Sequence, residues 1–211
     1  MTHTNHRQGT RESLSRDYVV FMYAAKGIND KDAGQKLQEF LRMGYQHGPV
    51  NAGPARTGDV FLSAPEKVLE RIGRATSAYL VYDDRAKVEA LVQDVVKADL
   101  GLSVIVSGLF DEVDGICRAA GIRRHTAQCS LGVWGKIEKL PPPEILDVST
   151  MCGHGMVSFN LVRRTAMEVN KGLVSLEEAG RILARPCACG IFNPRRAQDL
   201  LREYIARNLS Q

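Results

Sequence analysis

The chain has 211 residues, of which 44% are hydrophobic and 25% are charged. This composition is typical of a globular protein, and the length suffices for one large core or two small ones. The net charge of +4 is mild and the basic residues are scattered, so the charge gives no reason to expect a nucleic acid as a partner.

The first residues of the chain are polar and lack the apolar stretch of a secretory signal. We therefore expect a flexible tail over residues 1–16 and a cytoplasmic location. No apolar run approaches the roughly 20 residues of a spanning helix, which argues against a membrane partner. Five cysteines in such a chain favour metal ligands or reactive thiols over a disulfide framework.

Residues 17–140 alternate short β-branched or aromatic runs with helical patterns, which predicts an α/β domain. Strands are expected over 18–24, 77–83, 102–109 and 125–134, and helices over 30–48, 65–75, 85–99 and 110–121. The strand, helix and strand between residues 77 and 109 form a βαβ unit. The apolar stripe of its helix consists of Val88, Leu91, Val92, Val95 and Val96.

Three consecutive prolines, Pro141 to Pro143, form a stiff spacer that marks the best domain boundary. Residues 144–211 are then predicted to be a mostly helical, cysteine-rich region that packs on the α/β domain. A short strand is expected over 145–150, followed by helices over 156–172, over 174–184 and from Asn193 onward. Ser175 and Glu178 have capping-box spacing, and Asn193 with Pro194 is a typical helix start.

Two glycine-bounded stretches of this region hold most of the thiols. "MCGHG" contains Cys152, and "RPCACG" contains Cys187 and Cys189. We expect each stretch to lie at the start of a helix, where the helix dipole and free amides lower the pKa of a thiol. Three thiolates repel one another unless a cation or cluster lies among them. The pattern therefore predicts a shared metal centre.

Further ligand candidates lie next to these thiols or on the expected strand 125–134. His154 follows Cys152 by two residues, and His125 and Cys129 would share one strand face, so that one of them could complete a set of four ligands. We include Cys129 as a possible metal ligand and His125 and His154 as possible catalytic groups. Cys117 falls on an apolar helix face and is expected to pack as a small hydrophobe.

The spacing of the ligands bears on the kind of metal centre. Structural zinc sites usually show C-x(2 to 4)-C pairs, whereas here the motifs are C-x-H and C-x-C. Three cysteines suit an iron-sulfur cluster of the 4Fe-4S type with one open iron, which acts as a Lewis acid. The leading hypothesis is thus a cluster-dependent enzyme, lyase-like or desulfurising, that acts on a small anionic substrate. Zinc is the alternative metal.

Paired arginines are the candidates for binding an anionic substrate. Arg195 and Arg196 fall in the first turn of the last predicted helix, where cations oppose the dipole, so they are available for a carboxylate or phosphate. Arg124 belongs to a similar pair and is included with them.

The turn "MCGHG" followed by a helix resembles the cysteine-bearing turn of the proline racemase family. The resemblance implies that Cys152 acts as a proton-transfer base and that the glycine-rich helix start holds a substrate carboxylate. Only Cys152 and His154 would take over such roles, because the chain has no second turn of this kind.

Two further functions remain open beside the cluster enzyme. One is a metal-free enzyme in which Cys152 is the base or nucleophile and His154 or His125 its partner. The other is a non-enzymatic module that zinc staples together. A homo-oligomer is possible in each case.

Overall fold

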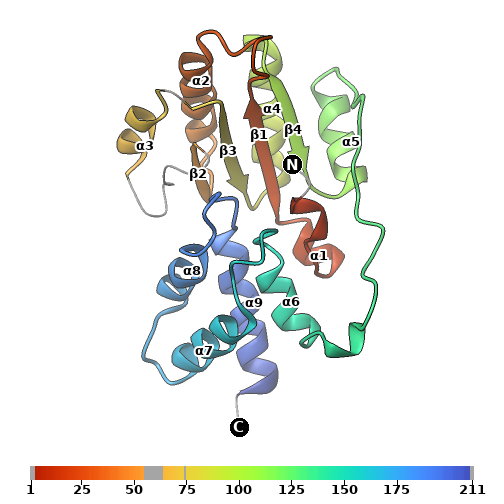
Figure 1. Cartoon of the computed structure of the whole chain (residues 1–211), viewed down its shortest axis with the longest axis vertical. Coiled ribbons are helices and arrows are strands. Elements are labelled where there is room, and N and C mark those ends of the chain that lie inside the picture. The colour runs from red at the N-terminus through yellow and green to blue at the C-terminus, as the bar shows by residue number, and fades with distance from the viewer. Residues whose placement is uncertain (1–2, 55–63, 74, 210–211) are drawn as a thin grey trace.

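The computed structural model describes residues 3–54, 64–73 and 75–209. Its sheet consists of β1 (Tyr18–Tyr23), β2 (Asn51–Pro54), β3 (Ser77–Tyr82) and β4 (Ser103–Ser107). The strand order is β2-β3-β1-β4 (Figure 1), and every neighbouring pair is antiparallel. The α/β class predicted for the N-terminal part is confirmed, and strands lie in this part whereas helices dominate the C-terminal part.

The βαβ unit predicted over residues 77–109 is present in split form. Its strands β3 and β4 run parallel to one another because both are antiparallel to β1, which lies between them. The unit formed by β1, α2 (Ala33–Gln46) and β2 is split in the same way by β3. Two interleaved split units give the β-α-β-β-α-β topology called ferredoxin-like, a name for the strand order alone.

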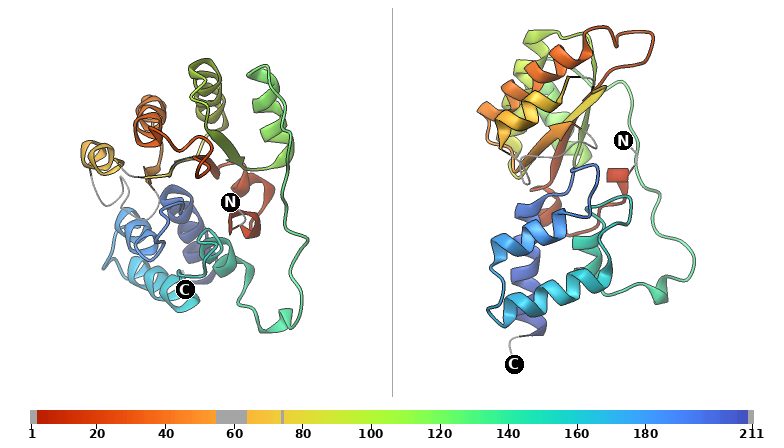
Figure 2. Two further views of the ribbon diagram at one scale, coloured as in Figure 1. Left: turned by 45° about the horizontal axis from the view of Figure 1, so that its top comes forward. Right: turned by 60° about the vertical axis from the view of Figure 1, so that its left-hand side comes forward.

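Alternate residues of the two central strands serve two different cores, since neighbouring side chains of a strand point to opposite faces. Val20 of β1 and Leu80 of β3 pack with α2 and with α4 (Arg85–Ala98) on one face. Val19 and Val81 pack on the other face with the C-terminal helices. Helices of different parts of the chain therefore pack on opposite faces of the sheet (Figure 2), and the C-terminal helices cover their face where Val19, Tyr79 and Val81 lie.

The other helices of the N-terminal part are α3 (Pro65–Arg71) and α5 (Phe110–Ala119), both at predicted places. The strand predicted over residues 125–134 is wrong. Residues 122–136 form an exposed coil along the outside of the molecule, in which Trp134 is 82% exposed. Gly132 and Gly135 have φ angles of +112° and +90°, so the backbone leaves strand geometry there.

The C-terminal helices are α6 (Pro143–Ser149), α7 (Phe159–Asn170), α8 (Leu176–Ala184) and α9 (Pro194–Asn208). The strand predicted over 145–150 is wrong, because this stretch belongs to α6. Pro143 starts that helix, and Ile145, Leu146 and Ser149 share its buried side at helical spacing. The predicted caps are confirmed, since Ser175 accepts from the Glu178 amide and Asn193 from the Arg196 amide.

The N-terminal segment, expected to be a flexible tail, is held against the C-terminal helices. It contains η1 (His3–His6) and α1 (Arg11–Leu14). Arg7 forms an ion pair with Asp17, and the two side chains are 5% and 0% exposed. Buried charges are stable only when paired in this way, so the ion pair fixes the segment in place. No helix in the described part of the chain is long and apolar enough to cross a bilayer.

Candidate functional site

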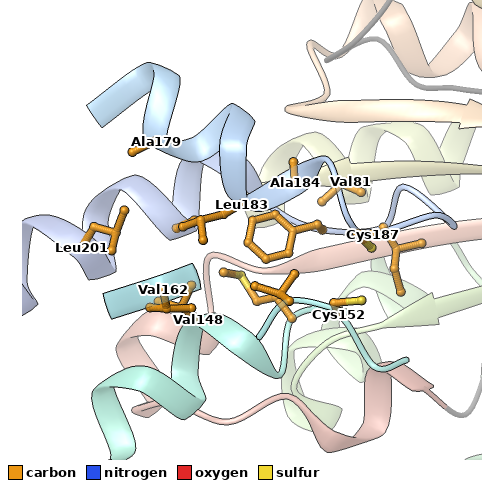
Figure 3. Packing of buried hydrophobic residues seen from close by; sticks show 14 of the residues in the cluster. Val81, Val148, Cys152, Val162, Ala179, Leu183, Ala184, Cys187 and Leu201 are labelled. Carbon is orange, nitrogen blue, oxygen red and sulfur yellow. The ribbon is translucent and has the colours of Figure 1, made fainter. Parts of the chain in front are cut away.

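The three thiols predicted to form a site lie together between two loops. Cys152 belongs to the loop between α6 and α7, and Cys187 and Cys189 belong to the loop between α8 and α9. The sulfur atoms of Cys187 and Cys189 are 3.7 Å apart, and the thiol of Cys187 also hydrogen-bonds to Cys152. Figure 3 shows Cys152 and Cys187 where the C-terminal core meets Val81 of the sheet.

His154 joins this cluster from the solvent side. Its Nδ1 atom lies 3.6 Å from the sulfur of Cys189. Cys152 is 2% and Cys187 4% exposed, whereas Cys189 is half-buried and His154 is exposed. The cluster thus has a buried side made of two thiols and an accessible side made of Cys189 and the imidazole.

The expectation that each thiol loop lies at a helix start is wrong. Cys152 follows the end of α6, and its amide still donates to the Ser149 carbonyl at 3.2 Å. Cys187 follows the end of α8 in the same way, and its amide donates to the Ala184 carbonyl at 2.9 Å. The C-terminal end of a helix carries partial negative charge. Both helix ends therefore favour a cation among the thiols.

The thiolate of Cys152 is stabilised by hydrogen bonds instead of a helix dipole. The thiol of Cys187 is its main donor, and the amides of Met156 and His154 add to it, so the pKa of Cys152 is lowered to about 6 although burial opposes this. The same bond to Cys152 raises the pKa of Cys187, and burial raises it further. The hydrogen bond between the two groups therefore favours the thiolate at Cys152 and the thiol at Cys187.

Asn51 anchors the second thiol loop to the sheet, a role that the sequence did not indicate. Its side chain on β2 is 0% exposed, and its Nδ2 donates to the carbonyls of Gly190 at 2.6 Å and of Phe192 at 3.3 Å. Gly190 has a φ of +74°, and a Cβ atom there would lie 1.7 Å from the hydroxyl of Tyr79 on β3. The loop is thus fixed against two strands.

Arg7 holds the two thiol loops to one another. Its Nη2 donates to the carbonyl of Met151 at 3.3 Å and to that of Ile191 at 2.5 Å. These carbonyls lie one residue before Cys152 and two residues after Cys189. A single buried guanidinium therefore bridges both loops, and nothing in the pattern of the N-terminal residues indicated this.

The strand that would have aimed His125 and Cys129 at the thiols does not form. Both residues are exposed on the coil, and the imidazole of His125 pairs with the hydroxyl of the adjacent Thr126 at 2.8 Å. Cys117 is 8% exposed in the N-terminal part, in line with its expected packing role.

The candidate anion-binding arginines have different surroundings. Arg196 is 3% exposed and its guanidinium is paired with Asp17 at 2.8 Å, so it is enclosed by the N-terminal segment. Arg124 is exposed and forms an ion pair with Asp114 at 2.9 Å, with its guanidinium 4.7 Å from the ring centroid of Phe110. Arg195 is exposed on the first turn of α9.

The four groups of the cluster are neighbours but do not yet form a closed coordination shell. Within residues 3–54, 64–73 and 75–209, no three or more His, Cys, Asp or Glu side chains are arranged to hold a metal ion as they stand. The contacts run as a chain from Cys152 through Cys187 and Cys189 to His154. Closing it requires rotations about side-chain bonds, and the side chain of His154 is exposed.

Comparison of the chain with protein-family models, with curated proteins and with solved structures gave no match.

Proposed function

We propose that the protein binds one tetrahedrally coordinated metal ion, with zinc as the best-fitting ion, through Cys152, His154, Cys187 and Cys189. The observation that carries this proposal is the spacing of the donor atoms. The two sulfur atoms of Cys187 and Cys189 are 3.7 Å apart, and Nδ1 of His154 is 3.6 Å from the sulfur of Cys189.

These distances match the edges of a tetrahedron around one zinc ion. Zinc bonds of about 2.3 Å to sulfur and about 2.0 Å to nitrogen give edges of about 3.8 Å between two sulfurs and about 3.5 Å between sulfur and nitrogen. A 4Fe-4S cluster keeps its cysteine sulfurs roughly 6 to 7 Å apart. The spacing therefore favours zinc, the alternative metal of the sequence analysis, over the cluster.

The surroundings of the donors also suit a cation. The ends of α6 and α8 place partial negative charge at the loops that carry Cys152 and Cys187. Backbone amides of Met156 and His154 donate to the sulfur of Cys152, as amides commonly do to metal-bound thiolates. The metal would join the two thiol loops, which Asn51 and Arg7 already connect to the sheet and to the N-terminal segment. Its role in this proposal is to stabilise the assembly of the two parts.

The lowered pKa of Cys152 supports a second candidate function, the metal-free thiol enzyme. A thiolate with a pKa of about 6 can serve as a base or nucleophile at neutral pH. Cys152 is only 2% exposed, however, so a substrate would reach it only after the loop around His154 had moved. This burial makes the thiol enzyme the weaker candidate.

The proposal is tested by loading metal-free protein, purified under reducing conditions without oxygen, with Zn²⁺ and separately with Co²⁺. We expect one ion per chain. Bound Co²⁺ should show thiolate-to-metal charge transfer together with the strong visible bands of tetrahedral coordination. The free energy of unfolding should rise with zinc concentration, because the ion binds the folded chain.

Matched variants separate the possible sites. Cys187→Ser and Cys189→Ser should abolish equimolar binding, His154→Ala should weaken it, and Cys129→Ser, which changes an exposed thiol of the coil, should leave it unchanged. Binding that survives Cys187→Ser contradicts the proposal. Protein that is brown and contains iron with acid-labile sulfide would favour the cluster instead.

The remaining expectations from the sequence stay predictions. They concern a small anionic substrate, a cytoplasmic location and a homo-oligomer. Each needs its own experiment, since none follows from the metal site.

A further inference from the structure

We propose that Cys187 and Cys189 form a redox-active pair, in which hydrogen peroxide oxidises Cys189 and Cys187 then closes a disulfide. The part of this inference that concerns release of the ion rests on the proposed metal site. The pair itself rests on the geometry of the thiols alone.

Solvent access selects Cys189 as the thiol that reacts first. Within the cluster, Cys152 is 2% and Cys187 4% exposed, whereas Cys189 is half-buried and lies on the accessible side with the exposed His154. Peroxide reacts with thiolates that it can reach. Cys189 is therefore the entry point for the oxidant.

Cys187 is placed to resolve the oxidised Cys189. Its sulfur is 3.7 Å away, and the amide of Gly190 donates to the carbonyl of Cys187 at 2.8 Å, which folds residues 187–190 into a tight turn. A disulfide bond of about 2.05 Å thus requires the sulfur atoms to approach by less than 2 Å, a change that side-chain rotations supply. Asn51 holds the carbonyl of Gly190, so the turn persists while the side chains rotate.

The chemistry balances with hydrogen peroxide as the only oxidant. The thiolate of Cys189 attacks one peroxide oxygen, the O–O bond breaks, and after protonation a sulfenic acid and one water are formed. The thiol of Cys187 then attacks the sulfur of this sulfenic acid, and the proton of this thiol passes to the leaving hydroxide, which departs as a second water. Overall, two thiols and one hydrogen peroxide become one disulfide and two waters.

Closing this disulfide removes two of the four proposed ligands, because a disulfide sulfur no longer carries the charge that binds zinc. Cys152 and His154 alone would hold the ion far more weakly. Oxidation would therefore release the metal from the protein, and reduction of the disulfide by a thiol would restore the site.

The experiment uses the full-length Cys129→Ser protein, so that the exposed thiol of the coil does not react. Metal-free protein is treated with hydrogen peroxide, its remaining thiols are alkylated, and it is digested with trypsin. Cys187 and Cys189 fall in one expected peptide, residues 182–195, because trypsin does not cleave between Arg185 and Pro186. Cys152 falls in another, residues 140–163. We expect the mass of the peptide 182–195 to be two hydrogen atoms below that of its reduced form, with neither cysteine alkylated.

Two variants test the order of events. In Cys187→Ser, the sulfenic acid of Cys189 should persist and be trapped by dimedone. In Cys189→Ser, formation of any disulfide should slow at least about tenfold, since the remaining thiols are buried. A disulfide that links residues 140–163 to residues 182–195, or oxidation of Cys189→Ser at the unchanged rate, would overturn the inference.

Release of the ion is measured on the zinc-loaded protein with a chromophoric chelator. One ion should appear for each disulfide formed, and a thiol reductant should return it to the protein. Retention of the ion after the disulfide has formed overturns the release step. If the protein never binds an ion, the proposed metal-binding function is wrong. The proposed disulfide is still tested independently, by the mass of the peptide 182–195.

Discussion

The side chain of Asn51 donates a hydrogen bond of 2.6 Å to the backbone carbonyl of Gly190, although 139 residues separate them in the chain. The bond joins an edge strand of the sheet to the loop that carries Cys187 and Cys189. The side-chain amide of Asn51 is buried, so each of the hydrogen bonds that it donates forms out of contact with water. The position of the thiol loop therefore depends on the N-terminal part of the protein.

Asn51→Ala should lower both stability and metal affinity. It leaves the buried carbonyls of Gly190 and Phe192 without this donor, which costs about 1–3 kcal/mol in the free energy of unfolding. Urea denaturation and zinc titration measure the two effects. Asn208→Ala is the matched control, because Asn208 donates to the Tyr204 carbonyl at the exposed end of α9. Equal losses in both variants would show that the anchor is unimportant.

Gly190→Ala should destabilise the protein much more than Gly172→Ala. Both glycines have positive φ angles, +74° and +69°, so both variants incur the backbone cost of about 1–2 kcal/mol. Only at Gly190 would the new Cβ overlap the hydroxyl of Tyr79, at 1.7 Å, whereas at Gly172 no atom lies within 4 Å. We expect an additional loss of about 1–3 kcal/mol for Gly190→Ala in urea denaturation. Equal stability of the two variants would contradict the close packing of this loop.

Arg7→Met should lower the free energy of unfolding by about 3 kcal/mol, because it leaves Asp17 as a buried charge without this partner. It also removes the donor to the carbonyls of Met151 and Ile191. Thermal and urea denaturation measure this. Arg11→Met is the control, since Arg11 pairs with Asp111 in solvent, where their side chains are 63% and 61% exposed. We expect no measurable change for the control. A stable Arg7→Met protein would mean that the N-terminal segment is dispensable.

Tyr45 should make the protein less stable at alkaline pH. Burial raises the pKa of Tyr45 from 10.0 to about 12, with a smaller effect of Glu66. The folded chain thus keeps the phenol neutral where the unfolded chain ionises, so this contribution is complete below pH 10.0 and is lost as the pH rises to about 12. Tyr45→Phe should flatten the fall in unfolding free energy over this range.

At neutral pH, Tyr45→Phe should not destabilise the protein, because the hydroxyl of Tyr45 is buried and has no hydrogen-bond partner among the described residues. Tyr82→Phe provides the comparison. The hydroxyl of Tyr82 donates to the carbonyl of Gly44 at 2.8 Å, so its removal should cost about 1 kcal/mol. A larger loss for Tyr45→Phe than for Tyr82→Phe would be the contrary result.

Local patterns in the sequence were sufficient for most helices and for three of the strands. The capping residues Ser175 and Asn193 act through amides within three residues of themselves, so their effect is readable without the fold. The sequence predicts a strand over residues 145–150, but residues 145–149 lie within α6 and Thr150 is its C-cap, because a short apolar run has no period long enough to distinguish a strand from a helix. β2 was missed, since its sequence NAGP has no preference for a strand.

The sequence by itself determined that three thiols lie in two glycine-bounded loops of a helical region behind an α/β part. Only the tertiary structure decided which groups join them, because those contacts link residues far apart in the chain. His154 meets Cys189 across 35 residues, and Arg7 meets Ile191 across 184. Such contacts arise when segments that are distant in the sequence pack together, and side chains that reach distant groups leave no periodic or local signal in the sequence.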